Sequence, residues 1–444
     1  MRSLLDEPVG ATLIRLATPM VFGISAIVLF NIVDTFWVGQ LGALELAAMG
    51  FTFPVTMGIN SLTIGVSIGA SAVISRAIGA KEQRQVRRLT TDALLLAILI
   101  VMMVAALGFI FMDPLFRGLG ADERTLPLIK DYMRPWFAGI ALIVVPMVGN
   151  GAIRATGDSR SPAFIMVVSG LMNALFDPLL IFGWGPVPAM HLTGAAISTV
   201  LSYAFATAVA LWILAKRERM ITRAIVPLSA VLHSFGRILS IGLPAAATNL
   251  LNPLSNAALT RLVSEHGAHA VAAFGVGTRV EGLAMIGVIA LNGAITPFVG
   301  QNFGAGQIER VAETRRFLLR AAFVWGVPVA GLLAVVAYPL ASVFNDEAEV
   351  VSLTVSYMRI VPVSYAGFAL ALLTAAMFNA LHVPLRATLV ALVRLFGLAV
   401  PLAFVGSRLA GITGLFWGIA AANLLVGVLA VAMGRAHGKA VGYA

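Results

Sequence analysis

The fold is decided by the stretch Asn31-Ile32-Val33-Asp34-Thr35-Phe36-Trp37, which lies near the end of a hydrophobic run over residues 12–38. Asp34 is the only acidic residue in that run. A run of this length crosses the roughly 30 Å hydrocarbon core of a bilayer when it forms an α-helix. The stretch therefore predicts a transmembrane helix that carries a carboxyl group inside the membrane.

The composition of the whole chain is that of a membrane protein. Of its 444 residues, 59% are hydrophobic and 11% are charged, and the mean hydropathy is +0.95. Soluble domains contain only about 45–50% apolar residues. The 43 glycines suit helices that pack closely in lipid. We expect an all-α integral membrane protein that keeps its N-terminus, because residues 1–20 lack a signal-peptide cleavage site.

Hydrophobic runs of about 20 residues predict twelve transmembrane helices. They cover residues 12–38, 47–75, 90–112, 132–153, 162–184, 193–215, 236–260, 270–299, 317–343, 355–378, 386–406 and 411–434. An even number of spans places both termini on one side. If that side is the cytoplasm, 21 of the 30 Lys and Arg residues lie in inside segments and only 5 in outside segments. The positive-inside rule thus predicts a multi-pass protein of the cell (inner) membrane with both termini cytoplasmic.

The two halves of the chain resemble each other. Residues 41–50, LGALELAAMG, align with residues 266–275, HGAHAVAAFG, and Gly79-Ala80 aligns with Gly304-Ala305 at the same offset. Each half has an even number of spans, so both halves share one orientation. The repeat predicts two six-helix bundles related by a pseudo-twofold axis along the membrane normal.

The repeat also defines the expected domains. We predict an N-terminal lobe at residues 1–215, a cytoplasmic linker at residues 216–235 and a C-terminal lobe at residues 236–444. Two bundles that rock about a central cleft give alternating access. The duplication therefore favours a transporter over a channel or a membrane enzyme.

Four polar residues of the first half are predicted to form one pocket. Asp34 and Asp177 lie in spans that both run outward, and their carboxyl groups fall at similar depth. Asn173 precedes Asp177 by four residues and shares its helix face. Thr199 lies roughly 10 Å along the next, inward-running span, at 1.5 Å per residue. We predict that these residues bind the coupling cation.

A structural role is the alternative for both acids, with Asp34 ending a helix in the headgroup region and Asp177 bonding a neighbouring helix. However, the hydrophobic run continues beyond each of them. Intramembrane acids that face a bundle interior are functional by default. Burial and a like-charged neighbour both favour the protonated form, so that two such acids can share a proton.

Three further residues stand out in the predicted spans. Pro19 removes a backbone hydrogen bond early in the first span, either as a simple early-helix proline or as a hinge below Asp34. Arg279 and Glu281 are two residues apart and point to different helix faces. We expect them to form structural ion pairs or hydrogen bonds with other groups.

No catalytic, cofactor or metal site is predicted. The chain has no cysteine, and its six histidines lack metal-ligand spacing. A membrane prenyltransferase needs clustered acids to hold magnesium and diphosphate, whereas Asp34 and Asp177 are isolated. The net charge of +10 resides in short loops and not on a soluble basic face. We expect no enzyme and no nucleic-acid partner, but a monomer that contacts membrane lipid and small molecules.

The chain resembles the multidrug and toxic compound extrusion (MATE) family over essentially its whole length. The matching motifs are Val33-Asp34-Thr35 before Trp37-Val38-Gly39, the Arg154-Ala155-Thr156-Gly157-Asp158 to Pro162 loop, Asn173 to Asp177, and Gly194-Ala195-Ala196. The resemblance implies export of cationic, amphipathic compounds in exchange for protons or sodium ions. The alternative is a flippase or exporter of a lipid-linked or other amphipathic metabolite in the same superfamily.

Within this family the chain is more similar to the DinF-like branch. That branch couples through an Asp in span one and an Asn and an Asp in span five, which correspond to Asp34, Asn173 and Asp177. The NorM-like branch has an acid in span seven, where this chain has Asn252. A tyrosine frequent one turn before the first Asp is replaced by Phe30.

Overall fold

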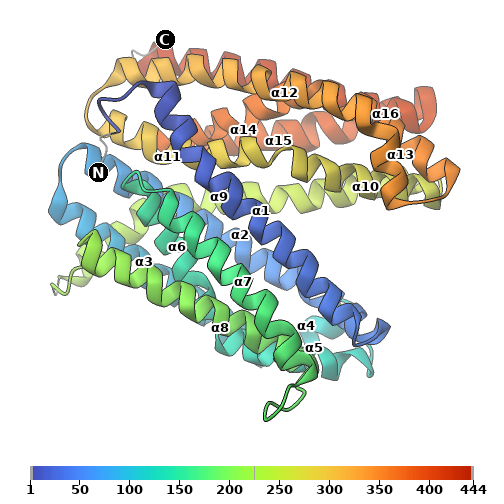
Figure 1. The fold of residues 1–444 in the computed structure, drawn as a ribbon. Helices are drawn as coiled ribbons and strands as arrows, with labels where there is room; N and C mark the ends of the chain where they lie inside the picture. Colours follow the sequence, from blue (N-terminus) through green and yellow to red (C-terminus); the bar gives the residue numbers. More distant parts are fainter. Residues whose placement is uncertain (1–3, 225, 442–444) are drawn as a thin grey trace. The chain divides into compact units, whose positions relative to one another are not determined.

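The computed structural model describes residues 4–224 and 226–441, and these residues are almost entirely helical (Figure 1). In this part of the chain, β-type pairing is limited to an isolated bridge between Trp184 and Val187. The predicted all-α class is therefore confirmed. The elements are α1 Val9–Gly39, α2 Ala43–Gly79, α3 Gln83–Ile110, α4 Met112–Gly118, α5 Thr125–Ala138, α6 Ile140–Ala155, α7 Arg160–Phe182, α8 His191–Trp212, η1 Ile213–Arg217, α9 Leu228–Ser264, α10 Ala268–Ala284, α11 Ile286–Gly304, α12 Ile308–Phe344, α13 Ala348–Ile360, η2 Val361–Ser364, α14 Tyr365–Ala380, α15 Pro384–Leu392, η3 Val393–Ala399 and α16 Val400–Val441.

These helices account for the predicted spans. Within residues 4–224 and 226–441, nine helical segments are long and apolar enough to cross a membrane, and the bent pairs α5–α6 and α10–α11 raise the number to eleven. The last of the nine, Pro384–Ala440, has 57 residues, more than twice the length of one span. Its backbone leaves helical geometry at Ala410 and Gly411, and φ of Gly411 is +60°. Division at this kink gives twelve spans.

Two spans are bent at positions where hydropathy predicts continuous helices. Helices α5 and α6 meet at 54° around Gly139, and α10 and α11 meet at 46° around Met285. A Cβ atom at Gly139 would overlap the Val200 side chain, so the absence of a side chain at the bend lets α8 approach closely. Hydropathy did not reveal either bend because both sides of each bend are apolar.

By packing, the described chain divides into two compact units. We call Pro19–Ala246 the N-unit, and Met1–Thr18 with Ala247–Ala444 the C-unit. The unit boundaries fall inside α1, between Thr18 and Pro19, and inside α9. The units describe packing, whereas the predicted lobes at residues 1–215 and 236–444 follow the sequence repeat and stay a prediction.

The segment before α1 is held within the C-unit. The Arg310 guanidinium donates hydrogen bonds to the carbonyl oxygens of Glu7 at 2.6 Å and Leu4 at 3.2 Å. The Asn302 amide also donates to the Leu4 carbonyl, at 3.2 Å. Leu4 and Leu13 are almost fully buried. The first turns of α1 are therefore part of the C-unit core.

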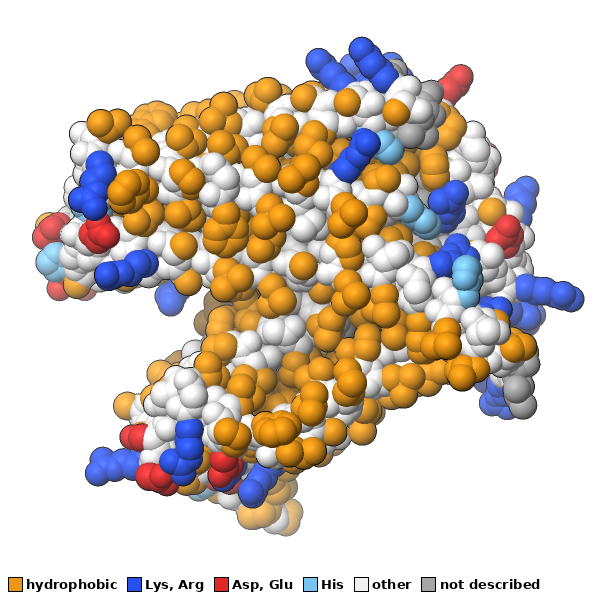
Figure 2. Space-filling model, turned by 180° about the vertical axis from the view of Figure 1, so that it is seen from behind, with side chains coloured by type: hydrophobic (Ala, Val, Ile, Leu, Met, Phe, Trp, Pro, Cys, Tyr) orange, Lys and Arg blue, Asp and Glu red, His pale blue; other side chains and the backbone are white. Residues whose placement is uncertain are grey.

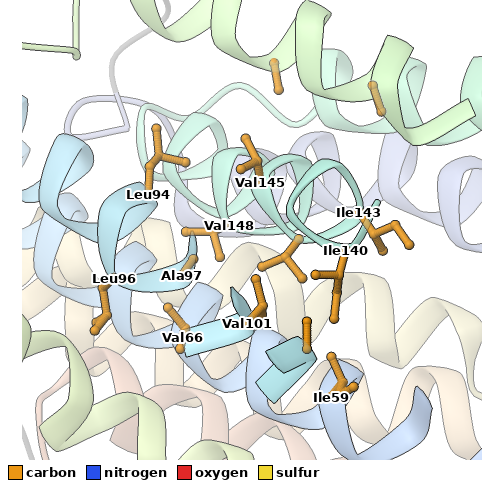
Figure 3. Packing of buried hydrophobic residues seen from close by; sticks show 14 of the residues in the cluster. Ile59, Val66, Leu94, Leu96, Ala97, Val101, Ile140, Ile143, Val145 and Val148 are labelled. Carbon is orange, nitrogen blue, oxygen red and sulfur yellow. The ribbon is translucent and has the colours of Figure 1, made fainter. Parts of the chain in front are cut away.

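The core of the N-unit lies between α2, α3 and α6. Figure 3 shows the packing of its apolar side chains, including Ile59, Val66, Leu94, Leu96, Ala97, Val101, Ile140, Ile143, Val145 and Val148. Small polar residues join the helices as well, since the Ser67 hydroxyl donates to the Met147 carbonyl at 2.9 Å. Gly151 lies against Ser67 with no room for a Cβ atom. Small residues at such crossings let membrane helices pack closely.

The surface agrees with insertion in a bilayer. Figure 2 shows hydrophobic side chains along the lengths of the helices, while Lys, Arg, Asp and Glu gather near helix ends. Many large apolar side chains, such as Phe22, Phe53 and Val335, are exposed. Exposed apolar surface of this extent suits contact with lipid and not with water.

Candidate functional site

All four predicted site residues lie in the N-unit, on three helices. Asp34 is on α1, Asn173 and Asp177 are on α7, and Thr199 is on α8. Helices α7 and α8 pack side by side (Figure 1). The structure therefore brings the polar residues of α7 and α8 to one helix interface, and α1 adds the second acid.

Asp177 is fully buried and is oriented by its own helix. The Asn173 side-chain amide donates a hydrogen bond to Oδ1 of Asp177 at 3.1 Å, as expected for residues four apart on a helix. The same amide donates to the Ser198 hydroxyl at 3.1 Å. In turn, Ser198 donates to the Asn173 carbonyl at 3.2 Å. Asn173 is therefore held from two sides and fixes one oxygen of Asp177.

The carboxyl groups of Asp34 and Asp177 interact directly through their side chains. Oδ1 of Asp34 and Oδ2 of Asp177 are buried and accept no hydrogen bond. Among the described residues, no Lys, Arg or His forms an ion pair with either acid. A buried carboxylate without a partner is costly. One proton or one small cation between the two groups would provide what both oxygens lack.

Tyr132 on α5 connects Thr199 to the acids. Its hydroxyl group lies near Thr199 and interacts electrostatically with Asp34 and Asp177. The Thr199 hydroxyl also donates to the Ala195 carbonyl at 3.1 Å. Tyr132 is 7% exposed, so this hydroxyl group sits in the interior. Thr199 thus joins the pocket through Tyr132.

Sequence reasoning missed Ser198 and Tyr132. Ser198 directly precedes the predicted Thr199, and Tyr132 opens the predicted span over residues 132–153. A search for hydroxyl groups at the depth of Asp34 would have found Tyr132. Single serines are frequent in membrane helices, however, and only the packing of α8 on α7 identifies Ser198.

The loop before α7 anchors the helix that carries Asn173 and Asp177. Asp158 accepts hydrogen bonds from the backbone N–H groups of Arg160 at 2.9 Å and Ser161 at 3.0 Å, and it forms an ion pair with Arg217. Burial raises the pKa of Asp158, but the bonds from Ser161 and Arg217 outweigh it and hold the pKa below its ordinary value. An ionised carboxylate at a helix start also favours the helix dipole.

The remaining predicted residues lie outside this pocket. Pro19 is in α1, roughly 22 Å along the helix axis from Asp34 at 1.5 Å per residue, and it is the first residue of the N-unit. Glu281, in the C-unit, accepts a hydrogen bond from the Tyr357 hydroxyl at 3.3 Å. Arg279 is exposed. No ion pair between Arg279 and Glu281 is found in the described chain.

The chain is similar to known membrane transporters over most of its length. The MatE family model matches residues 19–179 and 244–405, which together are most of the chain. A protein of Shewanella oneidensis named FAD transporter is 40% identical over 425 residues, covering 96% of this chain and 94% of the relative. The probable multidrug resistance protein YoeA of Bacillus subtilis is 27% identical and covers 83% of this chain and 80% of its own length.

A solved structure shares the whole fold. The crystal structure of the Vibrio cholerae MATE transporter VcmN in the bent form aligns with a TM-score of 0.91 at 29% sequence identity. The alignment covers 97% of this chain and 98% of that chain. The fold described above is therefore that of a known transporter architecture.

Proposed function

Because this chain belongs to the MatE family of transporters, and is not an enzyme, we propose that it is a secondary active exporter driven by an inward flow of protons. The coupling site is the pair Asp34 and Asp177, supported by Asn173, Ser198 and Thr199. The observation that carries this proposal is the pair of buried carboxyl oxygens without hydrogen-bond donors on two acids that interact directly. A shared proton supplies the missing donor.

A proton suits this pocket better than a sodium ion. Sodium needs several oxygen ligands around it, and Asn173 presents its amide nitrogen, a donor, to Asp177. The Ser198 hydroxyl hydrogen is directed to the Asn173 carbonyl. Two of the side chains nearest to Asp177 are therefore engaged as donors. We assign the chain to the DinF-like branch on the same residues.

Exchange of substrate for protons follows because the two compete for the pocket around Asp34 and Asp177. Protonation removes one negative charge from the acid pair, which weakens the attraction of the pair for neighbouring polar groups and lets α1 rearrange above Pro19. Substrate then binds less well in the protonated state, and this difference in affinity is what shifts the population between inward-open and outward-open states. Substrate leaves as the proton enters. Both termini stay in the cytoplasm of the cell in which the exporter works.

Transport in proteoliposomes tests this function, with proton and sodium gradients imposed separately. We expect a proton gradient to drive uptake of a cationic amphipathic dye without ATP, and an equal sodium gradient to drive none. The Asp34→Asn variant should not transport. Uptake driven by sodium alone would assign the pocket to sodium, and no uptake under either gradient would refute the exporter.

The substrate has two candidate classes. Amphipathic cations follow from the multidrug relatives, such as the 27% identical YoeA protein. FAD, an anionic dinucleotide, follows from the Shewanella oneidensis relative, with 40% identity over nearly the full length of both chains. We keep FAD as the second candidate because its relative has the higher sequence identity to this chain. Competition between FAD and the dye in the same proteoliposomes distinguishes the two classes.

A further inference from the structure

Arg394 of the C-unit lies inside a predicted span and forms no ion pair with any described residue. Arg394 belongs to η3, a π-helical stretch between α15 and α16. It is about 12 Å from the start of the predicted span over residues 386–406, at 1.5 Å per residue. Short π-helical stretches inside α-helices occur frequently at functional sites. A charged arginine at this depth in the membrane costs free energy, so such residues are functional by default.

The guanidinium group of Arg394 is ordered by an aromatic ring. Its Cζ atom lies 3.7 Å from the centroid of the Phe368 ring on α14, in a cation–π contact. The Nε atom is buried and has no hydrogen-bond partner, while the residue as a whole retains partial exposure. The ring covers one face of the guanidinium group. The N–H donors lie in the plane of the guanidinium group, so the ring does not use them.

No acid neutralises Arg394 by contact. In the part of the chain that the structure describes, Arg394 forms neither an ion pair nor a hydrogen bond. Glu281 interacts with it electrostatically, but the Glu281 carboxylate accepts its hydrogen bond from Tyr357. Elsewhere, Arg88 pairs with Asp92 and Arg217 pairs with Asp158. Arg394 therefore differs from these structural arginines.

We propose that Arg394, stacked on Phe368, binds a phosphate or carboxylate group of the transported substrate. The planar fork of N–H donors fits two oxygens of such a group at once. Glu281 lies near enough to weaken the attraction, so that the anion is released again during each cycle. This site is separate from the acid pair of the N-unit, and the inference rests on the exporter function proposed above by naming the anionic group of its substrate.

A flavin series tests the assignment, because riboflavin and FMN differ only in one phosphate group. Riboflavin, FMN and FAD share one ring system but carry no, one and two phosphate groups. We expect the purified full-length protein in nanodiscs to bind FMN and FAD at least tenfold more tightly than riboflavin. A single charge-assisted contact is sufficient for a preference of that size. Equal affinity for all three ligands would overturn the proposal.

Two variants of Arg394 distinguish the effect of its positive charge from the effect of its planar set of N–H donors. Arg394→Gln should abolish the preference for FMN and FAD over riboflavin, and Arg394→Lys should restore part of it. Because the readout is a ratio of affinities, a general loss of active protein does not imitate it. Arg279→Gln, which removes an exposed charge of the same unit, should keep the preference. A preference unchanged in Arg394→Gln would refute the site.

Two controls are needed. One tests whether the anion belongs to a lipid headgroup, and the other distinguishes failure of this inference from failure of the exporter function. Adding an anionic phospholipid to the nanodiscs should leave FAD affinity unchanged, and competition by that lipid would assign Arg394 to a headgroup and overturn the substrate site. If gradient-driven dye transport is intact while Arg394→Gln keeps its preference, only this inference fails. If no gradient drives any transport, the exporter function fails instead.

Discussion

Oδ1 of Asp34 and Oδ2 of Asp177 are both buried without a hydrogen-bond donor, although the two carboxyl groups interact directly. The other oxygen of Asp177 is already satisfied by Asn173 at 3.1 Å. One oxygen of Asp177 therefore has its hydrogen bond, whereas the oxygens Oδ1 of Asp34 and Oδ2 of Asp177 still lack a donor. This asymmetry makes specific predictions for each residue around the pair.

Asp34→Asn should fold normally and lose gradient-driven efflux, because the amide keeps the shape of the side chain but cannot exchange a proton. The measurement is dye efflux driven by a pH gradient in inverted vesicles, with protein amount and monodispersity checked. Asp346→Asn changes an exposed acid of the C-unit and should transport as wild type does. Wild-type efflux by Asp34→Asn would reduce Asp34 to a structural residue.

Substrate affinity should decrease as pH falls, since proton and substrate compete through the same pocket. Binding of a cationic dye to purified protein across roughly pH 5 to 8, where buried carboxyl pairs take up protons, would measure the effect. Asp177→Asn should alter this dependence because it removes one of the two coupled groups. A wild-type affinity that does not change with pH would place the coupling elsewhere.

Ser198→Ala should shift the pH midpoint of dye binding without abolishing transport. The variant removes the hydrogen bonds between the Ser198 hydroxyl and Asn173, each contributing about 1 kcal/mol, and Asn173 then holds Asp177 less firmly. Ser202→Ala is the matched control, because the Ser202 hydroxyl donates its hydrogen bond to a backbone atom, the Ser198 carbonyl at 2.8 Å. Identical midpoints in all three proteins would exclude a role for Ser198.

Asp158→Asn should lower the melting temperature at pH 7, since the amide cannot replace the ion pair with Arg217 and the full set of helix-start bonds. The expected cost is about 1 kcal/mol. The folded-state pKa of Asp158 lies below its ordinary value, so its contribution is present above that ordinary value and is lost as pH falls through the folded-state pKa.

Thermal unfolding of wild type and Asp158→Asn at pH 7 and near pH 3 checks both parts of that prediction. The gap between the two melting temperatures should narrow at the lower pH. A gap that widens would show that the neutral carboxyl, and not the carboxylate, stabilises the loop.

Accessibility tags at Arg219 and at the C-terminus should both react only from the cytoplasm. Arg219 is exposed, so a label can reach it. The excess of 21 to 5 basic residues on one side of the predicted spans requires this orientation. Labelling of either position from outside intact cells would reverse the topology.

The sequence predicted the acid pair because carboxyl groups are conspicuous in hydrophobic runs, and helical spacing then connected Asn173 to Asp177. Twelve spans were predicted by length alone. The roles of Ser198 and Arg394 emerged only from packing, since hydropathy treats a buried hydroxyl or a stacked guanidinium as an interruption. The bend at Gly139 was missed for the same reason, as close approach between helices leaves no mark in composition.

Helix α1 begins in the C-unit and continues in the N-unit from Pro19. Cutting the gene in the loop before α9 would consequently not yield two self-sufficient halves. The C-terminal fragment would lack the Glu7 and Leu4 carbonyl groups that accept from Arg310, and its α12 would lose the cover of the first turns of α1. A C-terminal fragment that is expressed alone would therefore need residues 4–18 supplied as a separate peptide to complete its core.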